Sequence, residues 1–477
     1  MKRKGLWTVF AACLVASLTV LVNCSGGGGG SSTTTTPPPV ITGPSTTTTL
    51  ANTNTTSGGV GVLSTNGKTV AFVPTALGLS PIIVDGSGTL SPALKAARAA
   101  SSPISTSFGI DSCSVDVTDL KVVCVGYGSS KVAVFDITNF VATFDPSTIT
   151  SAEYDLAASV SPTYVIPTIG FSGGSCVNCG VATDPGEHRY IVSSGDGYRV
   201  MSYTSGTPLA SYPIPINENF GFDPEKNWIL SPEYSPNDTF TAMDGTTFTE
   251  DMTFRIVNIG NGKTYSWTKK MTCSDIDPVN CSSWSTTDSI SIDPVTKIAT
   301  MGEEWTNSFL FVDLSQAVFN DTDNTFTAPS TYLPLHDVAS EYNWLTTGTA
   351  VEPLSHILLV AEELGKGIGV LQLPSSSGTG GAFPAPSAWN YNTMLMPDND
   401  VCGTGYSWYA FGDPHGLAIF TSQVDNKPMG LLLDGSKQCA AIIDLEAFLA
   451  APKSTATGET NIVSATTSTA FIKFIKL

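Results

Sequence analysis

Three glutamates recur at one spacing from an acidic residue that precedes proline: Glu233 after Asp223, Glu303 after Asp293 and Glu362 after Glu352. The interval is ten residues each time, and Glu304 and Glu363 extend the second and third copies. Like charges brought close together cost free energy unless a cation or a basic partner offsets them. The repetition predicts a site for a divalent cation, with Ca²⁺ as the expected ion, or for a basic partner. The alternative is a set of solvated strand ends in an acidic chain.

Few other groups are arranged for catalysis. His188 and His415 follow Asp-Pro pairs and are expected in solvated turns, whereas His336 and His356 precede strands without a second ligand at metal-binding spacing. The chain contains no Gly-x-Ser-x-Gly elbow, phosphate-binding loop or dinucleotide fingerprint. Residues 320 to 324 alternate oxygen-bearing side chains as a calcium loop does, but they lack its glycine and distal glutamate, which favours a solvated loop. The sequence therefore names no catalytic residue.

The first 24 residues have the order of an export signal that ends at a cysteine. Basic residues 2 to 4 precede an apolar run from Leu6 to Val22, and Leu21-Val22-Asn23-Cys24 closes the segment. This order resembles the lipobox of bacterial lipoproteins, with Asn23 where a small residue is usual. The resemblance implies cleavage before Cys24, a lipid on that cysteine, and attachment to the bacterial cell envelope at the outer membrane or cell surface. The alternative is an uncleaved membrane anchor, since the apolar run is near the lower limit for crossing a bilayer.

Residues 24 to 58 are expected to form a flexible stalk. Glycine, threonine and proline tracts leave almost nothing to bury there, so the segment cannot fold by itself. Removal of residues 1 to 23 takes away three basic and no acidic residues, which changes the formal net charge from −19 to −22. Such a charge disfavours nucleic acid and acidic lipid headgroups as partners. Besides the membrane reached through the lipid, we expect a protein or small-molecule ligand and a monomeric domain.

Residues 59 to 477 carry a repeated pattern of short strands. An apolar strand ends in Asp, usually Asp-Pro, and a tight turn and a second apolar strand follow; a third strand ends in an apolar pair and then Asp or Asn. Proline needs no strand hydrogen bond and Asp caps its own turn, so both suit this position. Seven copies about 60 residues apart follow the pattern. Their landmarks are Asp116, Asp184, Asp223, Asp293 and Asp413, with weaker copies at Glu352 and at Val60 to Asp85.

Repeats of this kind predict an all-β fold, a β-propeller with seven blades and with six or eight as alternatives. They resemble the YVTN and lactonase-like propeller repeats over roughly residues 59 to 477. The segment from Ala470 to Lys476 alternates apolar and polar residues and is expected to complete the first blade. The insertion from Ser231 to Met252 is expected to rise beside the repeated glutamates. Two packed β-domains are the alternative fold.

Eight cysteines follow the signal, and an even number in an exported chain favours disulfides. They are Cys113, Cys124, Cys176, Cys179, Cys273, Cys281, Cys402 and Cys439. The first two lie at equal distances from a turn expected at residues 117 to 120, so they should face each other across a hairpin. The next two form a CxxC that lacks the setting of a redox or zinc motif, which favours a short disulfide. Exclusion leaves Cys273 with Cys281, and Cys402 with Cys439.

Two functions from different classes fit these patterns. The first is a non-catalytic binding or scaffolding propeller on the cell envelope, with or without dependence on a cation. The second, implied by the resemblance to lactonase-like propellers, is a metal-dependent hydrolase. The sequence contains few groups arranged for catalysis, which favours the binding module. The resemblance in fold does not establish hydrolase activity, because a fold by itself does not determine a function.

Overall fold

The computed structural model describes most of the chain from residue 59 onward. The described residues are 59–65, 68–75, 78–84, 96–98, 104–105, 109–110, 112–126, 132–138, 141, 161–166, 180–194, 197–204, 208–214, 220–241, 247–268, 289–302, 308–334, 346–362, 367–374, 383–385, 388–395, 416–422, 426–433, 439–452 and 471–476. The lipobox, the stalk and residues Glu303, Glu304 and Glu363 lie outside them.

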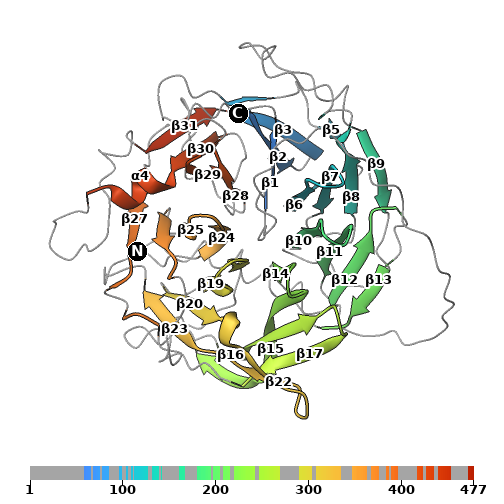
Figure 1. Ribbon diagram of the computed structural model, residues 1–477, viewed down its shortest axis with the longest axis vertical. Helices are drawn as coiled ribbons and strands as arrows, with labels where there is room; N and C mark the ends of the chain where they lie inside the picture. The colour runs from blue at the N-terminus through green and yellow to red at the C-terminus, as the bar shows by residue number, and fades with distance from the viewer. Residues whose placement is uncertain are drawn as a thin grey trace.

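The described strands form seven sheets arranged around a ring, so the prediction of an all-β propeller is confirmed (Figure 1). The predicted range was six to eight blades. The first three sheets are β1 (Gly61–Thr65), β2 (Lys68–Thr75), β3 (Gly78–Val84), β4 (Ala96–Arg98) and β5 (Ile104–Ser105); β6 (Ser112–Asp116), β7 (Lys121–Val125), β8 (Val132–Asp136) and β9 (Ser161–Ile166); and β10 (Val181–Asp184), β11 (Arg189–Ser194), β12 (Gly197–Ser202) and β13 (Pro208–Tyr212).

The fourth sheet has six strands, because it receives a hairpin from the segment that follows the third strand of the next sheet. It contains β14 (Gly221–Asp223), β15 (Trp228–Thr241), β16 (Thr247–Asn258), β17 (Lys263–Trp267), β22 (Thr325–Thr327) and β21 (Val318–Asn320). The fifth sheet contains β18 (Ser289–Ile292), β19 (Ile298–Gly302), β20 (Ser308–Asp313) and β23 (Ser330–Pro334). Residues 320 to 324, considered above as a calcium loop, therefore connect two strands of a hairpin.

The last two sheets are β24 (Thr346–Glu352), β25 (Ile357–Glu362), β26 (Gly367–Gln372) and β27 (Tyr391–Leu395), and then β28 (Leu417–Thr421), β29 (Pro428–Leu433), β30 (Cys439–Asp444) and β31 (Ile472–Lys476). Two short helices, η3 (Leu314–Gln316) and α4 (Leu445–Ala450), follow the third strands of their sheets. None of the helices in the described part of the chain is long and apolar enough to cross a membrane.

Apolar side chains buried between neighbouring sheets hold the ring together. Strand β7 reads Lys-Val-Val-Cys-Val, and its last four residues are buried although they alternate between the two faces of the sheet. A strand that is covered on both faces has such a continuous apolar sequence. Val123 and Val134 pack in one cluster with Val181 and Tyr190 of the next sheet. Each fully buried side chain of this size contributes about 1.5 to 3 kcal/mol.

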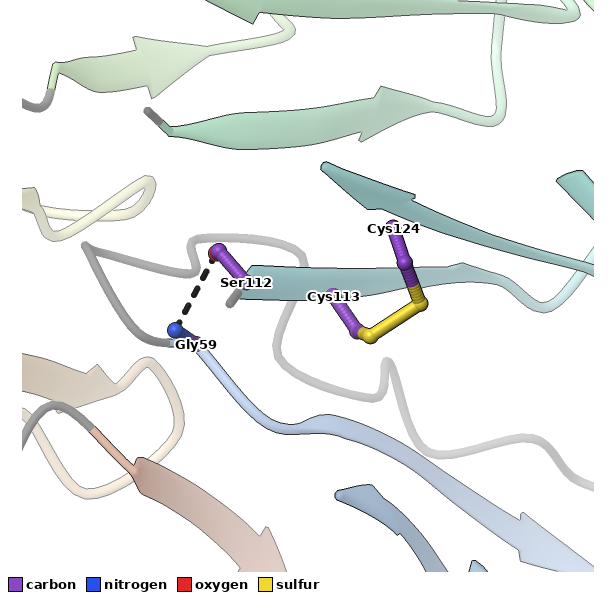
Figure 2. The surroundings of a disulfide bond; sticks show 4 residues. All are labelled: Gly59, Ser112, Cys113 and Cys124. Atoms are coloured by element: carbon purple, nitrogen blue, oxygen red, sulfur yellow. Dashed lines mark hydrogen bonds between the residues drawn. A yellow bond between two sulfur atoms is a disulfide. The ribbon is translucent and has the colours of Figure 1, made fainter. Parts of the chain in front are cut away.

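The C-terminal strand does not complete the first blade, so that prediction is wrong. Strand β31 pairs with β30 in the last sheet, where Ile443 lies opposite Ile472. The ring closes at its innermost strands, because the Val60 backbone N–H donates to the Leu417 carbonyl at 3.3 Å. On the other side the Gly59 backbone N–H donates to the Ser112 hydroxyl at 3.1 Å (Figure 2). Alternation in β31 is a property of any half-covered strand and does not specify which sheet it joins.

The propeller has two faces, which we name by the course of the innermost strands. On the turn face, these strands end in an acidic residue and a tight turn in five sheets, at Asp116, Asp184, Asp223, Asp293 and Glu352. On the start face, the innermost strands begin, and the second strands end. Because Gly59 lies beside the first residues of β6 and β28, the described chain begins at the start face.

The last sheet departs from the predicted repeat. Asp413-Pro414 was aligned with the turn between the first and second strands, but the first strand β28 begins after it, at Leu417. Strands β28 and β29 are joined after Thr421, where the Ser422 N–H donates to the Lys427 carbonyl at 2.8 Å. An Asp-Pro pair favours a turn wherever it occurs, so the pair alone could not distinguish these positions.

Candidate functional site

The acidic residues of the turn face cap their own turns. The Asp116 Oδ1 accepts from the backbone N–H groups of Thr118 and Asp119, both at 2.8 Å. In the fifth sheet, Asp293 Oδ1 accepts in the same way from Val295 at 2.9 Å. Carboxylates suit this position because they satisfy the donors that a tight turn leaves free. This capping explains why the sequence repeat has an acid at this point.

The last residue of the turn connects neighbouring sheets in four of the five turns. It has a left-handed backbone in all five, at Leu120, His188, Asn227, Lys297 and His356, with φ between 52° and 62°. Three of these side chains contact a carboxylate of the preceding sheet: His188 with Asp119 at 2.9 Å, Lys297 with Asp223 at 2.9 Å and His356 with Asp293 at 2.7 Å. A fourth, Asn227, accepts a hydrogen bond from Arg189 of the preceding sheet. We call these four contacts the clasps.

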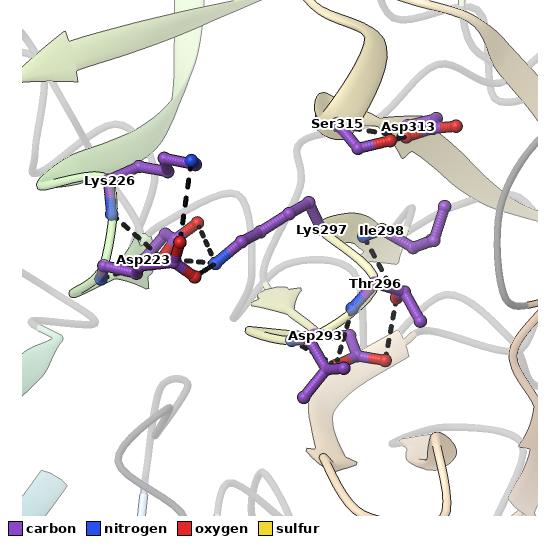
Figure 3. A network of polar contacts seen from close by, with 10 residues as sticks. Asp223, Lys226, Asp293, Thr296, Lys297, Ile298, Asp313 and Ser315 are labelled. Carbon is purple, nitrogen blue, oxygen red and sulfur yellow. Dashed lines mark hydrogen bonds and ion pairs between the residues drawn. The ribbon is translucent and has the colours of Figure 1, made fainter.

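The clasp of Lys297 is the most buried ion pair among them. Figure 3 shows Lys297 extending from its own turn to Asp223 of the neighbouring turn. The Lys297 side chain is 8% exposed and that of Asp223 is fully buried. The Lys297 Nζ also lies 2.8 Å from Glu225 Oε2, and this hydrogen bond lowers the pKa of Glu225. Removing one partner of such a pair leaves a buried charge without compensation.

Asp116 and Tyr203 form a second buried polar contact on the turn face. The Tyr203 hydroxyl donates to Asp116 Oδ2 at 2.7 Å and lies 3.1 Å from the Arg189 carbonyl oxygen. Burial raises the pKa of Asp116 above its ordinary value, although its backbone hydrogen bonds act in the opposite direction. Burial and the neighbouring carboxylate also raise the pKa of Tyr203. This proximity disfavours the ionised phenol, so Tyr203 acts here as a donor.

The carboxylates at the ends of the innermost strands are therefore already engaged. Asp116 accepts from Tyr203 and Asp184 pairs with Arg189 at 2.8 Å, while Asp223 and Asp293 take part in clasps. Within the ranges that the structure describes, no three His, Cys, Asp or Glu residues are grouped to hold a metal ion. Asp223 and Asp293 thereby join one blade to the next.

The two described members of the glutamate repeat, Glu233 and Glu362, belong to the other face. Glu233 lies in β15 opposite Thr253. Leu230 of the same strand pairs with Gly221, the first residue of β14, and Glu233 comes three residues later. Glu362 is the last residue of β25 and lies opposite Thr346, the first residue of β24. Both positions are at the start face, as the spacing from the acidic landmarks implied. The fifth sheet separates these two strands along the ring, and Glu303, Glu304 and Glu363 are outside the described residues.

Strands β15 and β16 extend beyond the rest of their sheet on the start face. Strand β14 pairs with β15 only as far as Leu230, and β17 pairs with β16 only from Arg255 onward. Beyond these positions the two strands pair with each other as far as Thr241 and Thr247, with one irregularity in register after Ser235. We call residues 231–241 and 247–254 the arm. The insertion predicted from Ser231 to Met252 is therefore a long hairpin.

Sequence reasoning missed the clasps, although a signal was present. His188 was expected in a solvated turn and His356 was noted only as lacking companion ligands. Both turn out to contact a carboxylate on the preceding sheet, and His188 remains largely exposed, at 65%. Four of the six acids named as landmarks are followed, four positions later, by His, Asn or Lys. That regular offset was visible in the sequence, but the partner lies on another repeat.

One predicted disulfide is described and confirmed. Cys113 and Cys124 lie opposite each other in β6 and β7 and are bonded (Figure 2). Cys439 lies in β30 opposite Lys476, whereas its predicted partner Cys402 is outside the described residues. Cys24, Cys176, Cys179, Cys273 and Cys281 are outside them as well, so the lipid attachment and the other pairings stay predictions.

Comparison with known proteins identifies a similar fold and no sequence family. No family model and no curated protein matches the sequence. Hydrazine synthase from Kuenenia stuttgartiensis is similar over 84% of this chain and 99% of its own, with a TM-score of 0.51 and 10% sequence identity. A functionally unknown protein from Desulfotomaculum acetoxidans matches over 81% and 93%, with a TM-score of 0.44 and 11% identity. A protein from Lactobacillus plantarum matches over 84% and 98%, with a TM-score of 0.42 and 9% identity. At 10% identity the similarity to hydrazine synthase shows a shared fold and no activity.

Proposed function

We propose that this protein is a lipoprotein of the bacterial cell envelope whose β-propeller is a binding module, with the start face as its binding surface. The arm is the observation that carries the proposal. The hairpin continues past the strands that pair on either side of it, so pairing within the sheet does not account for its length. Loops and extensions on a rigid scaffold are where binding functions concentrate.

Two further observations support the start face. The acids at which the innermost strands end on the turn face are engaged in turn caps, in the clasps and in the pairs with Tyr203 and Arg189. The described chain begins at the start face, at Gly59. A stalk running from Cys24 to that point would attach the domain to the lipid at its start face. A partner of the envelope would meet this face first.

Photo-crosslinking in intact cells tests the proposal. A benzophenone amino acid is placed at Thr249 of the arm in one variant and at Leu354, a 62% exposed residue of the turn face, in another. We expect adducts of defined mass from position 249 and none from position 354. Adducts from position 354 alone, or none from either position, would contradict a binding surface on the start face. Turnover of lactones that requires a divalent ion would favour the hydrolase instead.

A further inference from the structure

A hairpin from the fifth sheet lies on the outer edge of the fourth, the sheet that carries the arm. We call its residues, 318–327, the strap; it consists of β21, a turn and β22. Strand β22 pairs in parallel with β17, where Trp267 lies opposite Phe326 (Figure 1). The Thr268 backbone N–H donates to the Phe326 carbonyl at 3.0 Å. The fourth sheet is therefore extended by a hairpin that the neighbouring blade supplies.

Aromatic side chains attach the strap to the fourth sheet. The Phe319 ring centroid is 5.2 Å from that of Trp228 and 4.7 Å from that of Tyr265. The Phe326 ring stacks on Trp267, with the two centroids 6.4 Å apart. These separations are in the range of favourable aromatic pairs. Phe326 and Trp267 are both buried, so the strap covers part of the apolar cluster between the fourth and fifth sheets.

The same row of rings continues to the root of the arm. Trp267 is the last residue of β17, and its ring centroid is 5.5 Å from that of Phe254. Phe254 is buried, lies opposite Pro232, and comes one residue beyond the last pair between β16 and β17. Leu230, where the pairing of β15 with β14 stops, belongs to the same cluster. The strap thus reaches the arm through two successive ring contacts.

An ion pair holds the turn of the strap. Asp321 lies 2.9 Å from the Lys263 Nζ and accepts a hydrogen bond from the Tyr265 hydroxyl at 2.7 Å. Both contacts, chiefly that with Lys263, lower the pKa of Asp321. The side chains of Lys263 and Asp321 are 44% and 66% exposed, and exposed ion pairs contribute little to stability. The buried rings therefore carry most of the attachment.

We infer that the strap positions the arm, with Phe326 as the principal positioning residue. This inference rests on the proposed binding function, because it assigns residues of a neighbouring blade to the support of the binding hairpin. In the described pairing, the two strands of the arm have only each other as partners. A two-stranded hairpin is marginally stable by itself, so packing at its root sets its direction. Each residue of a strand adds about 3.3 Å, so a small tilt at the root becomes a large displacement at the tip.

Hydrogen exchange of the purified full-length protein tests the support of the arm. Phe326→Ala removes the ring of the strap. The matched control is Phe448→Ala, which removes an equally buried ring that stacks on Phe471 at 4.8 Å beside the last sheet. Both variants should melt at a lower temperature, because each leaves a cavity. Only Phe326→Ala should speed exchange of the backbone amides at residues 231–235 and 251–254, by about tenfold, since their local opening then requires less free energy.

Photo-crosslinking connects this support to binding. The benzophenone amino acid at Thr249 is combined, in intact cells, with Phe326→Ala or with Phe448→Ala. We expect the adducts of position 249 to be lost with Phe326→Ala and retained with Phe448→Ala, a difference that lowered stability alone would not produce. Phe326→Leu, compared with Phe448→Leu, repeats both measurements with a smaller cavity and a smaller loss of stability.

The outcomes separate the strap from the binding function. Equal exchange in the arm of the two alanine variants would overturn the positioning role. Adducts from position 249 that survive Phe326→Ala would overturn it as well, while they would uphold the start face as a binding surface. No adducts from the wild type at position 249 would contradict the binding function, and the exchange measurement would then decide the role of the strap by itself.

Discussion

Lys297 of the fifth sheet lies 2.9 Å from Asp223 of the fourth, and both side chains are almost completely buried. The pair joins two blades at the turn face. Lys297→Met should lower the free energy of unfolding by about 3 to 5 kcal/mol, because it leaves the Asp223 carboxylate buried without a cation. Denaturant unfolding followed by fluorescence measures the loss. Lys297→Met with Asp223→Asn should recover much of it, and a single variant as stable as the wild type would show that water reaches Asp223.

Asp116→Asn should leave the protein at least as stable as the wild type at neutral pH. The amide oxygen can accept from Thr118 and Asp119, and its nitrogen can donate to Tyr203, whose own hydroxyl then donates to the Arg189 carbonyl. Asp116→Ala should cost about 1 to 3 kcal/mol, since it leaves these groups without an acceptor. A destabilised Asp116→Asn variant would mean that the charge itself is required.

The same residue predicts a pH dependence. Burial raises the folded-state pKa of Asp116 above its ordinary value of 3.8, so the folded protein binds this proton more tightly than the unfolded chain does. The contribution of Asp116 to stability therefore improves as pH falls through the raised pKa toward 3.8, and it is least favourable at neutral pH. As the pH falls from 7 to 4, the unfolding free energy of the wild type should increase relative to that of Asp116→Asn. A constant difference would show that the pKa of Asp116 is not raised.

The disulfide between Cys113 and Cys124 should stabilise the second sheet. Both cysteines are fully buried and the bond closes a loop with a sequence separation of 11. The double replacement by alanine should lower the unfolding free energy by about 2 to 3 kcal/mol, by the loop-entropy estimate. Peptide mapping without reduction checks the bond itself. Recovery of either cysteine as a free thiol would contradict it.

The lipid anchor predicts a change in cell fractionation. Cys24→Ser should release the protein from the membrane fraction, because one acylated cysteine is the expected attachment and the mature chain is too acidic to bind acidic headgroups. Immunoblots of membrane and soluble fractions report the outcome, with Cys13→Ser as the matched control. Continued sedimentation of the Cys24→Ser protein with membranes would place the anchor elsewhere.

The cation hypothesis for the repeated glutamates has its own test. If Ca²⁺ binds at the start face, it should raise the midpoint of thermal unfolding in proportion to the logarithm of its concentration above Kd. Replacing Glu233, Glu303 and Glu362 together by Gln should remove that shift. The same melts with Mg²⁺ test selectivity. A wild type whose melting temperature does not respond to any divalent ion would rule out the metal version and leave the basic partner.

Local patterns in the sequence determined the strands, the turns and one disulfide of this protein. The β-branched and aromatic runs, the acidic turns and the symmetric spacing of Cys113 and Cys124 each depend on neighbours within one hairpin, so they could be interpreted without tertiary structure. The predicted repeat found the correct turns at Asp116, Asp184, Asp223, Asp293 and Glu352. It failed at Asp413, which was predicted to follow the first strand of its sheet, whereas that strand begins after it, at Leu417.

Contacts between repeats were decided only by the tertiary structure. The entry of β21 and β22 into the fourth sheet and the clasps from Lys297 and His356 join segments of different repeats. The membership of β31 in the last sheet and not in the first was likewise not determined by its own residues. The strand period fixes which residues share a face, but it does not say which sheet covers that face. Ring closure supplies this information, because each blade can bury its two faces only against its neighbours, and the positions of those neighbours depend on the whole chain.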